Sequence, residues 1–182
     1  MTRTLAAVAL LVLAPAARAQ DMPLAQILIP GEGWKKAEGA TKPKVTGLLA
    51  PVSDAAPWKS ATVRSADGNT VYVGFSKGTF LHAHALTRDG ALDQGHPYAP
   101  LRLRTGSPDI AVHGLAADRD GRIYAATDIG VQVFDPTGRM CGVLTPAAAG
   151  VPEALAFEGD QLTLWVGDTK YTRTLRTAGA KQ

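Results

Sequence analysis

The sequence of 182 residues lacks the features that mark several protein classes. It has one cysteine, Cys141, so no internal disulfide can form. The glycine and cysteine contents exclude collagen-like and disulfide-scaffold proteins, and 46% hydrophobic residues exclude a disordered chain. Residues 5–14 form an apolar run of ten, whereas a stable membrane-spanning helix needs about 20 residues. An ordinary globular chain remains.

A strong charge of one sign is also missing. The formal net charge is +3, but Arg3 and Arg18 lie in a segment that we expect to be removed, which leaves 17 basic against 16 acidic residues. A nearly neutral chain without a basic run has no electrostatic footprint for nucleic acid or an anionic membrane. We therefore expect neither partner.

The first residues have the pattern of a secretory signal peptide. Arg3 gives a positive start, the apolar run of residues 5–14 follows, and Pro15 ends it. Residues 17–19, Ala-Arg-Ala, form a cleavage site before Gln20. We expect residues 1–19 to be removed and the rest to be exported to the periplasm or the cell exterior, without membrane attachment. The alternative is a buried N-terminal helix.

An internal repeat predicts the architecture. Three segments combine a turn with a strand rich in β-branched and aromatic residues: residues 65–74, 118–127 and 158–167. Their aromatic residues, Tyr72, Tyr124 and Trp165, are 52 and 41 residues apart. Repeats of about 40–50 residues built from strands are typical of β-propeller blades.

Further strands are expected around these repeats. They cover residues 79–86, 123–127, 131–134, 140–144, 162–166 and 171–175, with turns that contain Gly or Pro between them. No amphipathic helix of ten or more residues is evident after residue 19. The sequence predicts an all-β protein.

The segment before the repeats has a different composition. Residues 35–44 are rich in Lys, Gly and Ala, with four lysines, so we expect a solvated arm or linker over residues 20–55. The alternative, a lysine-lined binding strip, would need a second basic element, which the sequence lacks. The β-propeller domain would then cover residues 56–182. Cys141, in the apolar run 140–144, is expected to be a small buried side chain, with a nucleophile as the alternative.

These residues resemble the gluconolactonase-like family, which includes senescence marker protein and regucalcin. The resemblance extends over about residues 56–175 and is carried by residues 23–34, 67–73 and, most closely, 113–135, which end in Ile-Gly-Val-Gln-Val-Phe-Asp. It implies a six-bladed propeller of which this chain has about three four-stranded blades. It also implies a metal-dependent hydrolase of sugar lactones, in which one divalent cation polarises the lactone carbonyl.

The residues that the family uses to hold its metal are not evident in this sequence. The blade that carries a glutamate ligand is missing, Ser60 stands where the resemblance places an asparagine, and Ala154 replaces a polar pore residue. His113 stands where the resemblance places the catalytic, metal-binding aspartate. We therefore expect a degraded metal site.

His113 is the candidate catalytic and metal-binding residue. It can favour Zn²⁺ over Ca²⁺, act as a general base without a metal, or be an ordinary residue at a strand end. Ser60, Asp109 and Glu153 are candidate substrate-binding residues, with solvated loop positions as the alternative. His82 and His84 alternate on one face of a strand, a spacing that can chelate a metal ion. Because no third ligand lies nearby in the sequence, we expect them to lie on an exposed face of the strand instead.

Two functions remain open. One is a sugar-lactone hydrolase that uses a divalent metal, Ca²⁺ or Zn²⁺; the other is a propeller that binds without catalysis or is a remnant. Three blades leave open sheet edges, which predicts a homodimer that completes a six-bladed propeller. The alternative is a truncated remnant in which the N-terminal arm partly covers the edges.

Overall fold

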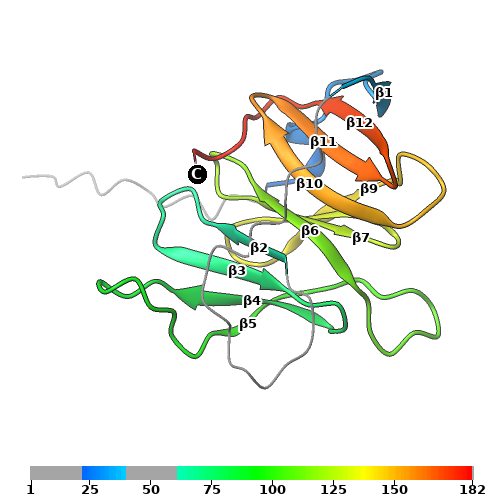
Figure 1. Cartoon of the computed structure of the whole chain (residues 1–182). Coiled ribbons are helices and arrows are strands. Elements are labelled where there is room, and N and C mark those ends of the chain that lie inside the picture. Colours follow the sequence, from blue (N-terminus) through cyan, green and yellow to red (C-terminus); the bar gives the residue numbers. More distant parts are fainter. Residues whose placement is uncertain (1–21, 40–60, 182) are drawn as a thin grey trace, which may run out of the picture.

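The computed structural model describes residues 22–39 and 61–181 (Figure 1). Three antiparallel four-stranded sheets make up the described fold, with one short 3₁₀ helix, η1 (Leu24–Gln26), near the start. The prediction of an all-β chain with about three propeller blades is confirmed. The predicted signal peptide, residues 1–19, and Ser60 lie outside the described residues. In the described ranges, no helix has the length and apolarity needed to cross a membrane.

Each sheet corresponds to one blade. Blade 1 contains β2 (Ala61–Arg64), β3 (Thr70–Gly74), β4 (Phe80–Ala85) and β5 (His96–Pro100). Blade 2 contains β6 (Val112–Ala117), β7 (Ile123–Thr127), β8 (Gly130–Phe134) and β9 (Met140–Leu144). Blade 3 contains β10 (Pro152–Glu158), β11 (Gln161–Val166), β12 (Thr169–Thr174) and β1 (Lys35–Ala37). The blades begin with β2, β6 and β10. These three strands lie side by side, with β6 between β2 and β10 and in contact with both.

The glycine-containing turns of the repeat connect neighbouring strands, as the sequence predicts. Gly68, Gly121 and Gly159 have φ angles of 76°, 86° and 64°, a region that only glycine enters without strain. In the second of these turns, Asp118 accepts backbone N–H groups from Asp120 and Arg122 at 3.0 and 2.9 Å. The turn residues therefore fix both the chain reversal and the start of the next strand.

Blade 2 is buried on both of its faces. Every residue of β7 and β8 is buried. One face packs on blade 1 through a cluster that includes Leu81, Ile123 and Phe134. The other face packs on blade 3 through a cluster that includes Tyr124 and Leu164. A strand with two covered faces favours a mostly apolar run, which β7 and β8 have apart from Thr127 and Gln132, whose polar groups are hydrogen-bonded.

Close contact between blades 2 and 3 depends on a glycine. A Cβ atom at Gly114 would lie 2.7 Å from the backbone nitrogen of Leu155 in β10. Gly114 thus lets the first strands of the two blades approach each other, which a larger residue would prevent.

The described part of the N-terminal segment is not a solvated linker. Lys35–Ala37 form β1, which pairs antiparallel with β12, so these three residues are a strand that covers a sheet edge and not a solvated linker. Pairing satisfies the backbone groups at the edge of β12, and the side chains of Lys35 and Lys36 stay exposed. Lysine side chains on an outer strand also discourage further pairing with other chains.

Residues just before β1 and near the C-terminus tie blade 3 to blade 2. The Trp34 indole Nε1 donates to the carbonyl of Thr145, just after β9, at 2.8 Å. Ile27 is buried in the cluster between the two blades. At the other end of the chain, the backbone nitrogen of Ala180 donates to the carbonyl of Ala117 at 2.9 Å. Both ends of the described chain therefore hold blades 2 and 3 together.

Candidate functional site

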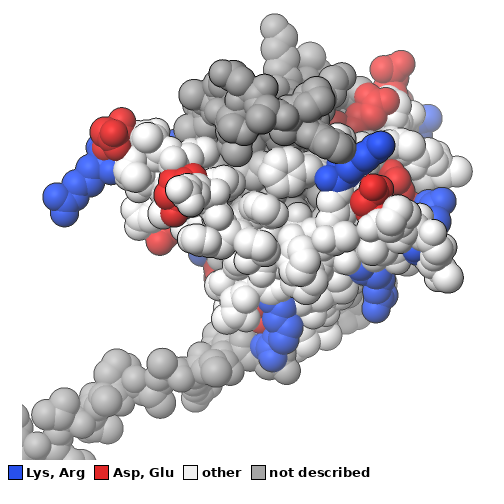
Figure 2. Space-filling view, turned by 90° about the horizontal axis from the view of Figure 1, so that it is seen from below, with Lys and Arg blue, Asp and Glu red and all other residues white. Residues whose placement is uncertain are grey.

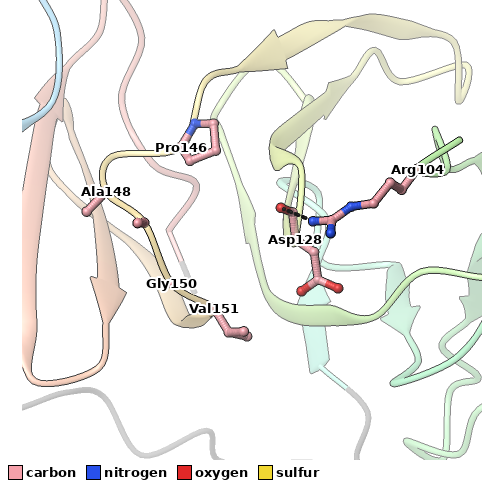
Figure 3. Close-up of a pocket in the computed structure, with 7 residues that line it drawn as sticks. Arg104, Asp128, Pro146, Ala148, Gly150 and Val151 are labelled. Atoms are coloured by element: carbon pink, nitrogen blue, oxygen red, sulfur yellow. Dashed lines mark hydrogen bonds between the residues drawn. The ribbon is translucent and has the colours of Figure 1, made fainter.

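A cavity of about 680 Å³ opens between three loops at one end of the blades (Figure 3). Arg104 comes from the connection between β5 and β6, and Asp128 comes from the tight turn between β7 and β8. Residues 146 and 148–151, in the connection between β9 and β10, form the opposite wall. This size is in the range of small-molecule sites.

Asp128 is the centre of the polar side of the cavity. His113 Nε2 and Asp128 Oδ1 lie 2.8 Å apart, with about a quarter of the imidazole side chain exposed. Arg104 Nη2 donates to the backbone carbonyl of Asp128 at 3.3 Å (Figure 3). The Asp128 carboxylate is thus bonded to an imidazole, and the guanidinium is bonded to the backbone carbonyl of the same residue.

The structure separates the residues that the sequence analysis grouped together. His113, on β6, reaches the cavity only through Asp128 and does not line it. Asp109 is half-buried before β6 and Glu153 is exposed on β10, and neither lines the cavity.

Sequence reasoning missed Asp128 and Arg104. Asp128 belongs to a three-residue stretch, Asp-Ile-Gly, whose pattern indicates only a hairpin turn, and Arg104 lies in a loop without strand pattern. The available signal was indirect: a partly buried histidine at a strand end needs a hydrogen-bond partner, and Asp128 is that partner.

The donor set at this site does not fit a resident Ca²⁺ or Zn²⁺ ion. Calcium takes six to eight oxygen ligands, and zinc sites usually have three or four protein ligands. Here one imidazole and one carboxylate are bonded to each other at 2.8 Å. In the described part of the chain, no group of three or more His, Cys, Asp or Glu side chains is arranged to hold a metal.

His82 and His84 do not form the exposed face that the sequence predicted. His84 is only 2% exposed, because Gly95 packs directly on its ring, and its Nδ1 lies 3.0 Å from the carbonyl of Asp93. His82 is half-buried and makes an edge-on contact with Phe75 at 5.2 Å between ring centres. A tight glycine turn covers this face, and the alternating pattern of the strand alone carries no sign of it.

Cys141 is half-buried beside the cluster between blades 2 and 3. Burial, with a further contribution from the charge of Asp135, raises the pKa of its thiol to about 11. A thiol that stays protonated at neutral pH is a poor nucleophile. The expectation of a packing role is therefore favoured over catalysis.

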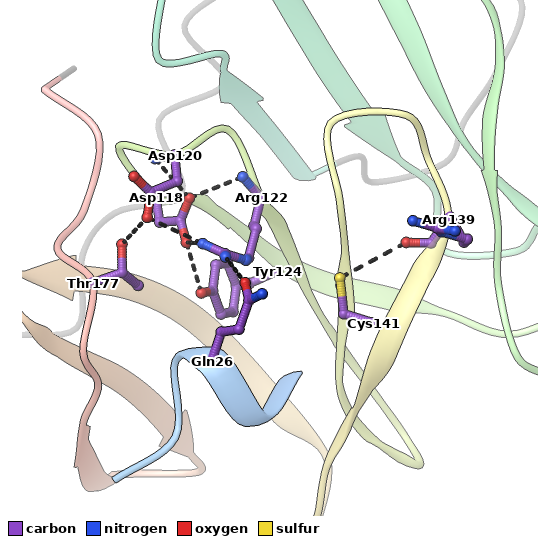
Figure 4. Close-up of polar contacts among 8 residues, drawn as sticks. All are labelled: Gln26, Asp118, Asp120, Arg122, Tyr124, Arg139, Cys141 and Thr177. Atoms are coloured by element: carbon purple, nitrogen blue, oxygen red, sulfur yellow. Dashed lines mark hydrogen bonds and ion pairs between the residues drawn. The ribbon is translucent and has the colours of Figure 1, made fainter. Parts of the chain in front are cut away.

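A second polar cluster is structural (Figure 4). The Asp118 side chain is fully buried and accepts from Arg122 Nη1 at 3.1 Å and from the Tyr124 hydroxyl at 2.9 Å. Arg122 Nη2 reaches Gln26 at 3.3 Å, and Thr177 donates to Asp120 at 3.1 Å. Burial, and then the charge of Asp118, raise the pKa of Tyr124. Four donors occupy the two oxygens of the Asp118 carboxylate, and the cluster joins the two chain ends to blade 2; Arg122 Nε is its one buried nitrogen without a hydrogen-bond partner among the described residues.

The surface seen in Figure 2 carries acidic and basic side chains at its periphery, with an uncharged area between them. Charges of both signs are interspersed over this face. The described residues on this face show no concentration of basic side chains of the kind that binds a polyanion.

Solved structures with the same fold come from the group that the sequence resembles. A gluconolactonase from Xanthomonas campestris matches with a TM-score of 0.53 and 27% identity, over 63% of this chain and 37% of that protein. A putative gluconolactonase matches with a TM-score of 0.55 and 19% identity, over 68% and 41% of the two chains. A regucalcin from Agrobacterium tumefaciens, described as a calcium-binding protein, matches with a TM-score of 0.51 and 18% identity, over 67% and 46%.

The chain thus spans less than half the length of these proteins. No protein-family model and no curated protein matches the sequence. The three sheets nevertheless match the solved propellers in strand arrangement, and the resemblance drawn from residues 113–135 points to the same group. The chain therefore has the fold of part of a gluconolactonase-like or regucalcin-like β-propeller.

Proposed function

We propose that this chain is an exported, lactonase-like propeller that binds small lactones, or the hydroxy acids they form, without a resident metal. Sugar lactones are the class that the resemblance implies. The 2.8 Å contact between His113 Nε2 and Asp128 Oδ1 carries the proposal. At the position where the resemblance places a metal-binding aspartate, this chain has a histidine whose ring nitrogen is already bonded to a carboxylate.

The remaining groups of the site suit recognition of a polar ring or its opened form. Asp128 offers carboxylate oxygens to ligand hydroxyl groups, and Arg104 offers N–H groups to a carbonyl or carboxylate oxygen. His113 orients the carboxylate from behind. We regard it as a positioning residue, since it does not line the cavity.

One observation favours a second candidate function, metal-free hydrolysis. A carboxylate and a guanidinium line the same cavity, which is the pairing of a general base with a group that stabilises an oxyanion. Asp128 would take a proton from water as the water oxygen bonds to the lactone carbonyl carbon. Arg104 would stabilise the oxyanion, and the proton would pass to the ring oxygen as its bond to the carbonyl carbon breaks.

Calorimetric binding and hydrolysis assays on a panel of lactones, with chelator or with added Ca²⁺, Zn²⁺ or Mn²⁺, test these functions. The proposal predicts binding that the chelator leaves unchanged and that falls at least tenfold in Asp128→Asn. Asp89→Asn, in an exposed turn of blade 1, is the matched control and should bind like the wild type. Hydrolysis that survives the chelator and is lost in Asp128→Asn supports the second candidate. Hydrolysis that the chelator abolishes and a metal restores contradicts both.

A homodimer that completes the propeller is also proposed. Its support is the arrangement of the sheets, since blades 1 and 3 each have one face that points away from blade 2 and from the other described sheets. In a closed propeller each such face packs on another blade. Light scattering of the purified chain should give twice the monomer mass, and a well-folded monomer contradicts the proposal.

A further inference from the structure

The two walls of the cavity beside Asp128 differ in chemistry (Figure 3). Arg104 and Asp128 form a charged wall. The facing wall consists of Pro146, Ala148, Ala149, Gly150 and Val151, none of which has a polar side chain. This asymmetry restricts the kind of molecule that fits between the walls.

The apolar wall is a poor match for a polyhydroxylated sugar. A sugar presents hydroxyl groups around its ring, and each one that leaves water without a hydrogen bond costs free energy. Residues 146 and 148–151 supply no side-chain donor or acceptor to such groups. Only the opposite wall offers charged partners.

Val151 supplies exposed apolar surface on this wall. It is 53% exposed and is one of two large hydrophobic side chains that are exposed in the described part of the chain. Phe80, the other, is 39% exposed and does not line the cavity. Val151 therefore leaves apolar surface in water at the position where a ligand can cover it.

The charged wall suits a molecule that carries one carboxylate and one hydroxyl group. The Arg104 guanidinium uses one N–H group on the Asp128 carbonyl, and a carboxylate is the preferred partner for the rest of its donor fork. Asp128 Oδ1 is bonded to His113, and the second carboxylate oxygen is placed to accept from a hydroxyl group.

We propose that the cavity binds an aliphatic hydroxy carboxylate, the opened form of an aliphatic lactone, in preference to a sugar acid. Its carboxylate contacts Arg104, its hydroxyl group contacts Asp128, and its hydrocarbon chain lies against Ala148 and Val151. This inference rests on the proposed function and names the class of ligand for the same site.

Two probes with six carbon atoms each separate chain polarity from size. Sodium 4-hydroxyhexanoate has one hydroxyl group and an alkyl end, whereas sodium gluconate has a hydroxyl group on every carbon outside the carboxylate. Calorimetric titration of the purified chain should give an affinity for 4-hydroxyhexanoate at least tenfold higher than for gluconate. Arg104→Gln should abolish binding, and Val151→Ser should weaken 4-hydroxyhexanoate several-fold with no loss for gluconate.

Arg88→Gln, in the exposed turn after β4, is the matched control for the loss of one positive charge. Thermal unfolding of each variant shows whether it is folded. Equal or tighter binding of gluconate overturns the aliphatic preference and leaves the proposed function standing. Unchanged binding in Arg104→Gln overturns the placement of the ligand. Binding of neither probe nor their lactones overturns both the inference and the proposed function.

Discussion

Blade 2 and the two blades beside it are built from the same repeat but have different surroundings. Blade 2 has a sheet against each face, and all residues of its two central strands are buried. Blades 1 and 3 each have one face that points away from the other described blades. The contribution of a residue to stability therefore depends on how many faces of its blade are covered, and not on its position in the repeat.

The polar side chains make the contrast clear. In blade 2, the buried Gln132 accepts from the backbone nitrogen of Arg102 at 2.8 Å and donates to Thr127 at 3.2 Å, while Thr127 donates to the Gly130 carbonyl at 2.8 Å. In blade 3, the buried hydroxyl group of Thr163 has no partner. Satisfied polar groups stabilise a core, and a buried group without a partner lowers stability.

The largest effect is expected for a large side chain between blades 1 and 2. Phe134 is fully buried, so Phe134→Ala should lower the free energy of unfolding by about 3–5 kcal/mol. Phe80, on the edge of blade 1, is 39% exposed, and Phe80→Ala should cost under about 1 kcal/mol. Chemical denaturation measures the free energy of unfolding of both variants. Equal losses would show that a buried position in blade 2 contributes no more to stability than the edge of blade 1.

A comparably large loss is expected where blade 2 holds the chain ends. Asp118→Ala leaves the buried Arg122 guanidinium without its main partner, which should cost about 3–5 kcal/mol. Asp135 makes the same kind of turn with Arg139, but this arginine side chain is 58% exposed, so Asp135→Ala should cost about 1–3 kcal/mol. If denaturation gives the reverse order, burial of the arginine is not what separates the two turns.

A smaller pair of changes compares satisfied and unsatisfied threonines. Thr127→Val removes a hydroxyl group with two partners in blade 2 and should destabilise the protein by about 1–2 kcal/mol. Thr163→Val removes a buried hydroxyl group without a partner and should be neutral or stabilising. Thermal unfolding decides, and a loss in Thr163→Val as large as in Thr127→Val would show that blade 3 satisfies this group.

The smallest effect is a pH dependence in blade 1. Burial, and then the charge of His84, lower the pKa of His82 below its ordinary value of 6.5. Near pH 6.5 the unfolded chain then binds more protons than the folded chain, so stability is retained above this pH and falls as the pH drops below it. His82→Gln should flatten the dependence of stability on pH between about 5 and 7. If the dependence of stability on pH has the same slope in this variant, a residue other than His82 causes it.

The acidic range has a different origin in blade 2. Burial acts to raise the pKa of Asp135, but hydrogen bonds from Thr137 and Arg139 outweigh it and lower the pKa. Its contribution is present above the ordinary value of 3.8 and is lost as the pH falls further. This window lies below that of His82, so the two residues act in different parts of one titration of stability against pH.

The sequence predicts the outer hairpins of the blades better than their first strands. Continuous β-branched and aromatic runs and Asp-Gly turns locate β7, β8 and β9 within a residue. By contrast, β6 contains Gly114 and two alanines, small residues that strand packing requires and that strand propensity does not mark. The lysines of β1 also hide a strand, because pairing with β12 overrides their local preference.

At the site, residue pattern identified one member of a pair. His113 stood out because it replaces an expected carboxylate, whereas its partner Asp128 lies in a turn where aspartate is ordinary. The contact between them depends on how the turn after β7 folds back toward the start of β6. Asp109 lies in the same connection as Arg104, and Glu153 follows Val151 by two residues, yet neither side chain lines the cavity.

The most direct test of the central claim is calorimetric titration of the purified, chelator-treated chain with Ca²⁺, Zn²⁺ and Mn²⁺. Because the His113 imidazole is bonded to Asp128 and the described residues hold no third ligand, we predict no stoichiometric binding of any of the three ions. His113→Asp, which restores the carboxylate that the resemblance implies, is the variant in which weak metal binding can return. Stoichiometric binding by the unaltered chain that is lost in His113→Ala would contradict the claim and establish a rebuilt metal centre.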